Sequence, residues 1–244
     1  KKEDEENWHI STWSHRAWFA VGCAAVLFAG LKSVRLASAA NAAGETTAWL
    51  KAGVSAVMGY LTADLSSGIY HWAIDNYGGA GTPFFGSQIE AFQSHHQQPW
   101  AITRRQLANN LHIAAAAVAA LILPFDVFSD DPSLLAFVAV YSGCVMFSQQ
   151  FHAWAHTPRG KLPAAVAALQ NAGILVARAP HATHHRPPYN SNYCIVSGIW
   201  NRFLDESKFF YAAEFAVAKF TGAQPRSWGE TTADWLQVAK EPED

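Results

Sequence analysis

Four long apolar stretches constrain the fold of this chain more than any other feature of its sequence. They comprise residues 17–31, 49–70, 111–125 and 133–151, and their only charged side chains are Lys51 and Asp64. A membrane-spanning helix needs about 20 predominantly apolar residues, so the second and fourth stretches are long enough. The first and third are shorter, and a helix in a soluble core or a re-entrant helix remains an alternative for them.

Aromatic residues near the ends of these stretches favour a membrane location. They are Trp13, Trp18, Trp49, Tyr70, Trp72 and Trp100. Tryptophan and tyrosine are enriched where a membrane meets water. We therefore predict an all-α integral membrane protein with about four transmembrane helices. The mean hydropathy of +0.01 would then average these helices with a polar cap.

The composition excludes several other classes of protein. Half of the residues are hydrophobic and only 15% are charged, which is the opposite of a disordered chain. Seventeen Lys and Arg against nineteen Asp and Glu exclude a basic nucleic-acid-binding protein. Three scattered cysteines, Cys23, Cys144 and Cys194, are too few for a disulfide scaffold or a thiolate zinc site.

Eleven histidines are unusual in a chain with so little other charge. Eight of them fall into four short sequence sets: His71 in H-W-A-I-D, which ends at Asp75; His95 and His96; His152 and His156 in H-A-W-A-H; and His181, His184 and His185 in H-A-T-H-H. We expect His9, His15 and His112 to have no metal role, because two lie in the N-terminal region and the third stands alone.

The spacing within these sets points to metal binding. Residues three or four positions apart share one face of a helix, so His152 and His156 point the same way, as do His71 and Asp75. His181 shares a face with both His184 and His185. Neutral imidazole is the commonest metal ligand, and packing does not explain three such sets in one chain. Asp75 is either a ligand itself or an acceptor that orients an imidazole.

The four predicted crossings bring all eight histidines to one face of the membrane. His71 would follow the second crossing, and His152 and His156 would end the fourth. The same face would carry six of the basic residues, against three opposite: Arg16, Arg104, Arg105, Arg159, Lys161 and Arg178, against Lys32, Arg35 and Lys51. The positive-inside rule places this histidine-rich cap on the cytosolic or stromal side.

Eight histidines are too many ligands for one ion and suit two ions with open positions. Imidazole-rich sites without thiolates hold Zn, Cu, Fe or Ni. The sequence lacks the H-E-x-x-H motif of zinc hydrolases and the G-x-S-x-G elbow of serine hydrolases. The chemistry that remains natural is the activation of dioxygen by two iron ions.

Longer strings around the histidines resemble the lipid desaturase family of membrane di-iron enzymes. They are YHWAIDNYG, QIEAFQSHHQQPWAITRRQ, SQQFHAWAH and HATHHRPPYNSNYCIVSGIWNRFLDESKFF. The likeness is greatest to the plant chloroplast branch, the palmitoyl-phosphatidylglycerol trans-3 desaturases, and extends to plasmanylethanolamine desaturases. It implies a membrane desaturase domain over residues 13–235, between a charged N-terminal tail (1–12) and a C-terminal tail (236–244).

The resemblance also implies a ligand set for two iron ions. It comprises His71, Asp75, His95, His96, His152, His156, His181, His184 and His185. In ordinary acyl desaturases the first histidine motif is H-x-x-x-H. In this chain the matching residues are His71 and Asp75, so an aspartate replaces the second histidine. His112 lies outside the shared pattern.

The implied reaction is an O2-dependent desaturation. Two hydrogens leave adjacent methylene carbons and O2 becomes water, which gives a trans-3 double bond in the palmitoyl chain of phosphatidylglycerol. Arg104 or Arg105 would hold the lipid phosphate, or would be positive-inside residues without specificity. No second cofactor motif is present, so an external donor such as ferredoxin would supply electrons. We interpret Cys194 as a small packed residue.

Two alternatives remain open from the sequence. The first is a plasmanylethanolamine desaturase of the endoplasmic reticulum, which forms the vinyl ether of plasmalogens. The second is a non-catalytic metal- or haem-binding membrane protein, such as a transporter or a bis-histidine cytochrome. We disfavour it because the apolar cores of the four stretches hold no histidine that could act as a ligand within the bilayer.

Overall fold

The computed structural model describes residues 7–229, and every regular element in that range is a helix. The predicted all-α class is therefore confirmed for this part of the chain. Residues 1–6 of the predicted N-terminal tail and the predicted C-terminal tail, 236–244, lie outside the described residues. The described chain divides into two compact units, 7–65 with 102–153 and 66–101 with 154–229.

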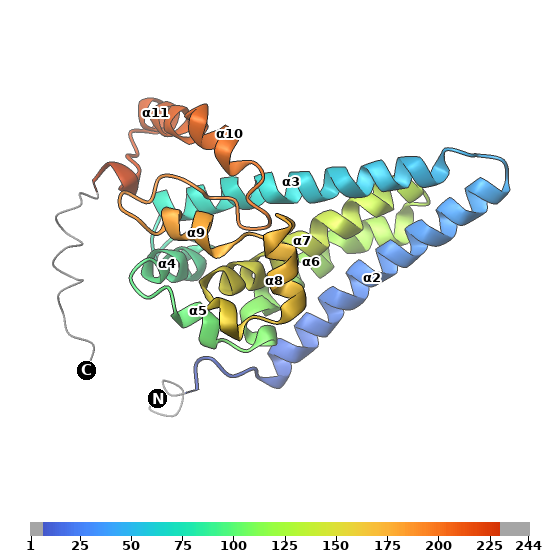
Figure 1. The fold of residues 1–244 in the computed structure, drawn as a ribbon, viewed down its shortest axis with the longest axis horizontal. Helices are drawn as coiled ribbons and strands as arrows, with labels where there is room; N and C mark the ends of the chain where they lie inside the picture. The colour runs from blue at the N-terminus through green and yellow to red at the C-terminus, as the bar shows by residue number, and fades with distance from the viewer. Residues whose placement is uncertain (1–6, 230–244) are drawn as a thin grey trace. The chain divides into compact units, whose positions relative to one another are not determined.

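The first unit consists of long helices. They are α2 (Trp13–Ala42), the first part of α3 (Ala48–Asn76), α6 (Leu107–Phe128) and most of α7 (Pro132–His156). α2 packs along α6 (Figure 1). This approach is close because Gly22 of α2 lies against Ala115, where a Cβ would be 2.8 Å from the alanine methyl group. Ala29, Ile122 and Leu135 form the centre of the packed apolar core.

Polar contacts fix one end of this helix pair. The Lys32 ammonium of α2 donates to the carbonyl oxygen of Asp126 at 3.0 Å and lies 3.1 Å from the Asp130 carboxylate. The Ser33 hydroxyl donates to the carbonyl oxygen of Pro132 at 2.7 Å. These bonds attach α2 to the turn between α6 and α7. Asp126 lies in the last turn of α6, where carbonyls lack an intrahelical partner, so the bond from Lys32 satisfies an otherwise open acceptor.

Within residues 7–229, three helices are long and apolar enough to cross a membrane: α2, α6 and α7. Their outer faces carry large exposed apolar side chains, such as Leu27 at 64% exposure and Leu121 at 71%. A soluble protein rarely leaves such continuous apolar surface uncovered. α3 has 29 residues but is not among the three. The count of four crossings therefore stays a prediction.

The second unit surrounds the C-terminal turns of α3 with short elements. They are α4 (Gly86–His95), η1 (Arg159–Lys161), α8 (Ala164–Asn171), α9 (Arg178–His184), α10 (Asn201–Glu206), α11 (Phe209–Thr221) and η2 (Arg226–Trp228), and the four-residue α5 (Ala101–Arg104) begins at its boundary. α4 and α9 lie beside the end of α3 (Figure 1). Ile74 of α3 packs against Ile89 and Phe92 of α4.

A small residue lets the loop after α9 approach α3 closely. A Cβ at Gly68 would collide with the Cys194 thiol sulfur and lie 3.3 Å from the Cys194 backbone nitrogen. Cys194 is fully buried, and its backbone N–H donates to the Asn201 side chain at 2.8 Å. These contacts support the interpretation of Cys194 as a packed residue.

We expect the substitution Gly68→Ala to destabilise the protein by about 1–3 kcal/mol, because the added methyl group overpacks a buried contact. Thermal unfolding of the purified protein in detergent measures this change. Gly53→Ala is the control on the same helix, since no atom lies within 4 Å of its Cβ position; we expect it to be neutral or stabilising. Equal effects of the two substitutions would contradict the packing argument.

Candidate metal centre

The predicted ligands within the second unit form two groups, each buried and each built from several elements. His71, Asp75, His96 and His184 form one group, which we call the aspartate group. His95, His156, His181 and His185 form the other, which we call the histidine group. In each group every residue offers one ligand atom, and these atoms lie within 4.8 Å of one another.

Histidines that are adjacent in the sequence belong to different groups, which helical spacing alone does not predict. His96 belongs to the aspartate group and its neighbour His95 to the histidine group. His184 and His185 divide in the same way. The rings of His184 and His185 lie 5.4 Å apart at an angle of 87°, so each adjacent pair supplies one imidazole to each group.

In the aspartate group, three imidazoles surround one carboxylate oxygen. The Nε2 atoms of His71 and His184 each lie 3.3 Å from Asp75 Oδ2. His96 Nε2 lies 3.4 Å from the same oxygen and 3.1 Å from His184 Nε2. His71 and Asp75 are one helical turn apart on α3, so the predicted shared face is confirmed.

Backbone carbonyls determine the tautomer of two of these imidazoles. His71 Nδ1 lies 2.9 Å from the Tyr193 carbonyl oxygen, and His184 Nδ1 lies 2.8 Å from that of Ser191. A carbonyl only accepts hydrogen bonds, so Nδ1 must carry the proton in each ring. In the neutral imidazole the Nε2 atom then presents a lone pair. Both lone pairs therefore face the oxygen of Asp75, and a cation between them satisfies all three groups.

In the histidine group, Nε2 atoms face one another across short distances. His156 Nε2 lies 2.9 Å from both His95 Nε2 and His181 Nε2. His185 Nε2 lies 3.2 Å from His181 Nε2. One nitrogen cannot be both donor and acceptor in the neutral ring, so hydrogen bonding alone does not satisfy this arrangement. A metal ion that accepts the lone pairs does.

His152 lies on the same helix as His156 of the histidine group. It lies at the boundary of the first unit, one helical turn before His156 on the same continuous helix, and it is 1% exposed. Residues at this spacing project from one face of a helix. The predicted pairing of these two histidines is thus consistent with the helix that carries them.

Burial keeps the imidazoles of the histidine group neutral. It lowers the pKa of His95 and of His181 well below the usual value of 6.5, and the neighbouring imidazoles lower both further. The pKa of His185 is lowered for the same reasons. A neutral imidazole is the form that binds metal, so these side chains are in the protonation state that metal binding requires at neutral pH.

Other predicted residues have different roles. His112 Nδ1 lies 2.8 Å from the Asn109 carbonyl oxygen, and its ring stacks on His15 at 4.0 Å. Neither residue belongs to the two groups, as expected. Arg104 and Arg105 lie in the first unit, where Arg105 lies over the ring of Trp8. Their assignment to the lipid phosphate stays a prediction.

Several positioning residues escaped the sequence analysis. They are Ser191 and Tyr193, whose carbonyls orient two imidazoles, and Tyr189, whose ring stacks on His96 at 4.4 Å. All three follow the H-x-x-H-H set within a few residues. Their closeness in sequence to this set could have indicated a role near the ligands. A contact made by a backbone carbonyl cannot be predicted from residue type, because every residue has one.

The sequence of this chain is similar to those of known lipid desaturases. A family model described as a lipid desaturase domain matches residues 60–228. The chain is 51% identical to fatty acid desaturase 4, chloroplastic, of Arabidopsis thaliana over 226 residues, which cover 93% of this chain and 68% of that protein.

Two relatives carry a different name. The chain is 36% identical to plasmanylethanolamine desaturase of Myxococcus xanthus over 180 residues, which cover 70% of this chain and 62% of that protein. It is 30% identical to plasmanylethanolamine desaturase 1 of Mus musculus, over 75% of this chain and 70% of that protein. No solved structure gives a significant match.

We expect acid to release metal from the site and to destabilise the metal-free protein. The unfolded chain protonates its histidines near pH 6.5, whereas the folded state does not. The histidine contribution to stability is therefore complete above pH 6.5 and falls below it, by up to about 1.4 kcal/mol per pH unit for each such histidine. Metal analysis and thermal unfolding at about pH 7.5 and about pH 5.5 test this expectation. Unchanged values in both would contradict it.

Proposed function

The chain belongs to the lipid desaturase family and is an oxidoreductase, and on this premise we propose that it forms a trans-3 double bond in the palmitoyl chain of phosphatidylglycerol. The observation that carries the proposal is the pair of ligand groups in the second unit. The resemblance of the histidine-rich strings to the plant chloroplast branch supports the choice of lipid and position.

We propose that two iron ions occupy the two groups. The aspartate group would hold one ion with His71, Asp75, His96 and His184. The histidine group would hold the other with His95, His156, His181 and His185, and His152 would complete it from α7. When bound, the two irons supply the activation of O2. The donor sets fit this role, because they consist of imidazole and one carboxylate without thiolate.

The protein's own residues orient the ligands and exclude water. The carbonyls of Ser191 and Tyr193 hold a proton on Nδ1 of His184 and His71, which directs each Nε2 toward the ligand group. His71, His181 and His184 are completely buried. This burial keeps water away from these three imidazoles.

The overall reaction requires electrons from outside the chain. Two hydrogens leave the lipid, and O2 takes them up with two further electrons and two protons to give two waters. We propose a ferredoxin as the external donor. The chloroplast membrane is the proposed location, since three Arabidopsis relatives are named chloroplastic. An ether-lipid desaturase of the endoplasmic reticulum is the second candidate, favoured by the plasmanylethanolamine desaturase relatives.

A single desaturase domain over residues 13–235 remains our proposal for the organisation of the chain. The family model covers residues 60–228, which lie within it. Arg104 and Arg105 remain proposed contacts for the lipid phosphate at the membrane surface.

Lipid analysis of a host that supplies phosphatidylglycerol and a ferredoxin tests the reaction. We expect the wild type and the control His112→Ala to produce trans-3-hexadecenoate on phosphatidylglycerol. His184→Ala removes a buried ligand, and we expect it to lower the product at least about a hundredfold. Plasmalogen in place of trans-3-hexadecenoate would transfer the assignment to the second candidate, and full activity of His184→Ala would overturn the role of the site.

Elemental analysis of the purified protein tests the metal assignment separately. We expect about two irons per chain in the wild type and in His112→Ala, as two ligand groups imply. We expect His181→Ala to retain less, because it removes a central nitrogen of the histidine group. Zinc alone in the wild type, or unchanged iron in His181→Ala, would contradict the di-iron assignment.

A further inference from the structure

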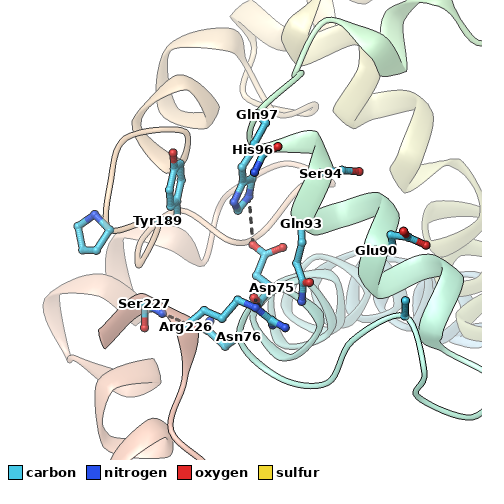
Figure 2. Close-up of a pocket in the computed structure, with 12 residues that line it drawn as sticks. Asp75, Asn76, Glu90, Gln93, Ser94, His96, Gln97, Tyr189, Arg226 and Ser227 are labelled. Atoms are coloured by element: carbon cyan, nitrogen blue, oxygen red, sulfur yellow. Dashed lines mark hydrogen bonds and ion pairs between the residues drawn. The ribbon is translucent and has the colours of Figure 1, made fainter. Parts of the chain in front are cut away.

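A polar cavity of about 400 Å³ opens beside the aspartate group within the second unit. Asp75 and His96 form part of its wall, together with Gln93 of α4 and Arg226 of η2. Figure 2 shows Arg226 and His96 on either side of Asp75. The remaining wall is largely amide, hydroxyl and carboxylate. These groups can form hydrogen bonds with a polar ligand, which an acyl chain cannot do.

Arg226 is the cation of this cavity, and its position is fixed from two sides. Its guanidinium donates to the backbone carbonyls of Asp75, at 3.3 Å, and of Gly78. The buried Glu214 of α11 accepts from the neighbouring Trp228 indole at 2.8 Å and the Ser227 hydroxyl at 3.2 Å. A guanidinium has five N–H donors, so these two bonds leave donors available to a ligand.

We propose that this cavity binds the glycerophosphate headgroup of the lipid substrate, with Arg226 as the contact for the phosphodiester. Arginine suits this role because its planar donors match the oxygens of a phosphate. The proposal rests on the proposed function, since it assigns the headgroup site for the same lipid. It is an alternative to the proposed contact of Arg104 and Arg105, because phosphatidylglycerol has a single phosphate.

The position of the reacting carbon supports this location. Carbon 3 of an acyl chain is only two bonds from the ester carbonyl, and a few more bonds lead to the phosphate. An enzyme that oxidises this carbon must therefore hold the headgroup close to its metal site. The cavity meets this requirement, because Asp75 and His96 belong both to its wall and to the aspartate group.

The α4 side of the cavity suits the hydroxyl groups of a glycerol. Glu90 and Gln93, one helical turn apart, and Gln97 just beyond the helix line this side. The Gln93 amide nitrogen donates to the Ile74 carbonyl at 3.0 Å, which turns its oxygen toward other donors. Carboxylate and amide oxygens accept hydrogen bonds from hydroxyl groups. Arg226 and α4 together therefore match the two ends of a glycerophosphate.

Binding of water-soluble dihexanoyl phosphatidylglycerol to the purified full chain in detergent tests the proposal without turnover. We expect Arg226→Gln to weaken this binding roughly tenfold to a hundredfold, the loss typical of a charge-assisted hydrogen bond. Arg202→Gln is the matched control, because Arg202 is an exposed arginine paired with Glu206 on α10. Binding to Arg226→Gln as tight as to the wild type would overturn the proposal.

Substitutions on α4 keep the test informative if Arg226→Gln fails to fold. Glu90 is exposed, so its substitution spares the core. We expect Glu90→Leu to weaken binding severalfold and Glu90→Gln to weaken it less, because the amide still accepts from hydroxyls. Equal losses for both would indicate a cationic headgroup, and no loss for either would remove α4 from the site. Either result overturns the glycerol assignment.

Two further ligands distinguish the headgroup from simpler chemistry. We expect dihexanoyl phosphatidylcholine to bind more weakly than the glycerol lipid, and inorganic phosphate to compete poorly. Equal binding of the choline lipid, or competition by phosphate as effective as that of glycerophosphoglycerol, would overturn the assignment. The lipid analysis tests the proposed function independently. Formation of the trans-3 product without Arg226-dependent binding would overturn only the headgroup site. Arg226-dependent binding without the trans-3 product would overturn only the proposed reaction.

Discussion

The orientation of neutral imidazoles by backbone carbonyls is the interaction on which the rest of this structure depends. The carbonyls of Ser191 and Tyr193 fix the proton of His184 and His71 on Nδ1, so that both Nε2 lone pairs face Asp75. This arrangement concentrates acceptors where a cation belongs. It also explains why the loop after α9 must return to α3, since only that path brings both carbonyls to the site.

Close packing makes this path possible. The loop contacts α3 where Gly68 has no side chain, and Cys194 occupies the space that a Cβ would need. The Ser67 hydroxyl accepts from the Ile195 backbone N–H at 3.0 Å in the same region. Small and polar residues in α3 therefore hold a loop against the helix, whereas a continuous apolar surface would pack against lipid or another helix. α3 is not among the candidate membrane spans of the described residues.

The second unit contains two different environments side by side: the buried ligand groups and the cavity beside Asp75. The ligand groups are buried and hold imidazole in its neutral form, whereas the cavity beside Asp75 is polar and contains a cation. The proposed desaturation close to an ester would use both: the metal site for the reacting carbon and the nearby cavity for the headgroup. Glu214 connects the two, because it accepts from Trp72 of α3 at 3.3 Å and from the residues that follow Arg226.

The sequence by itself determined the helical class, the apolar stretches and the identity of the candidate ligands. Helical periodicity places His71 with Asp75 and His152 with His156, because these contacts are local. It could not assign adjacent histidines to different groups, since His95 and His96 receive their partners from α3, α7 and α9. Nor could it find the carbonyls of Ser191 and Tyr193 or the cavity around Arg226, because backbone acceptors and distant side chains meet only after the chain has folded. Tertiary structure alone decided these contacts, since they depend on how the loop after α9 and the segment after α11 pack against α3.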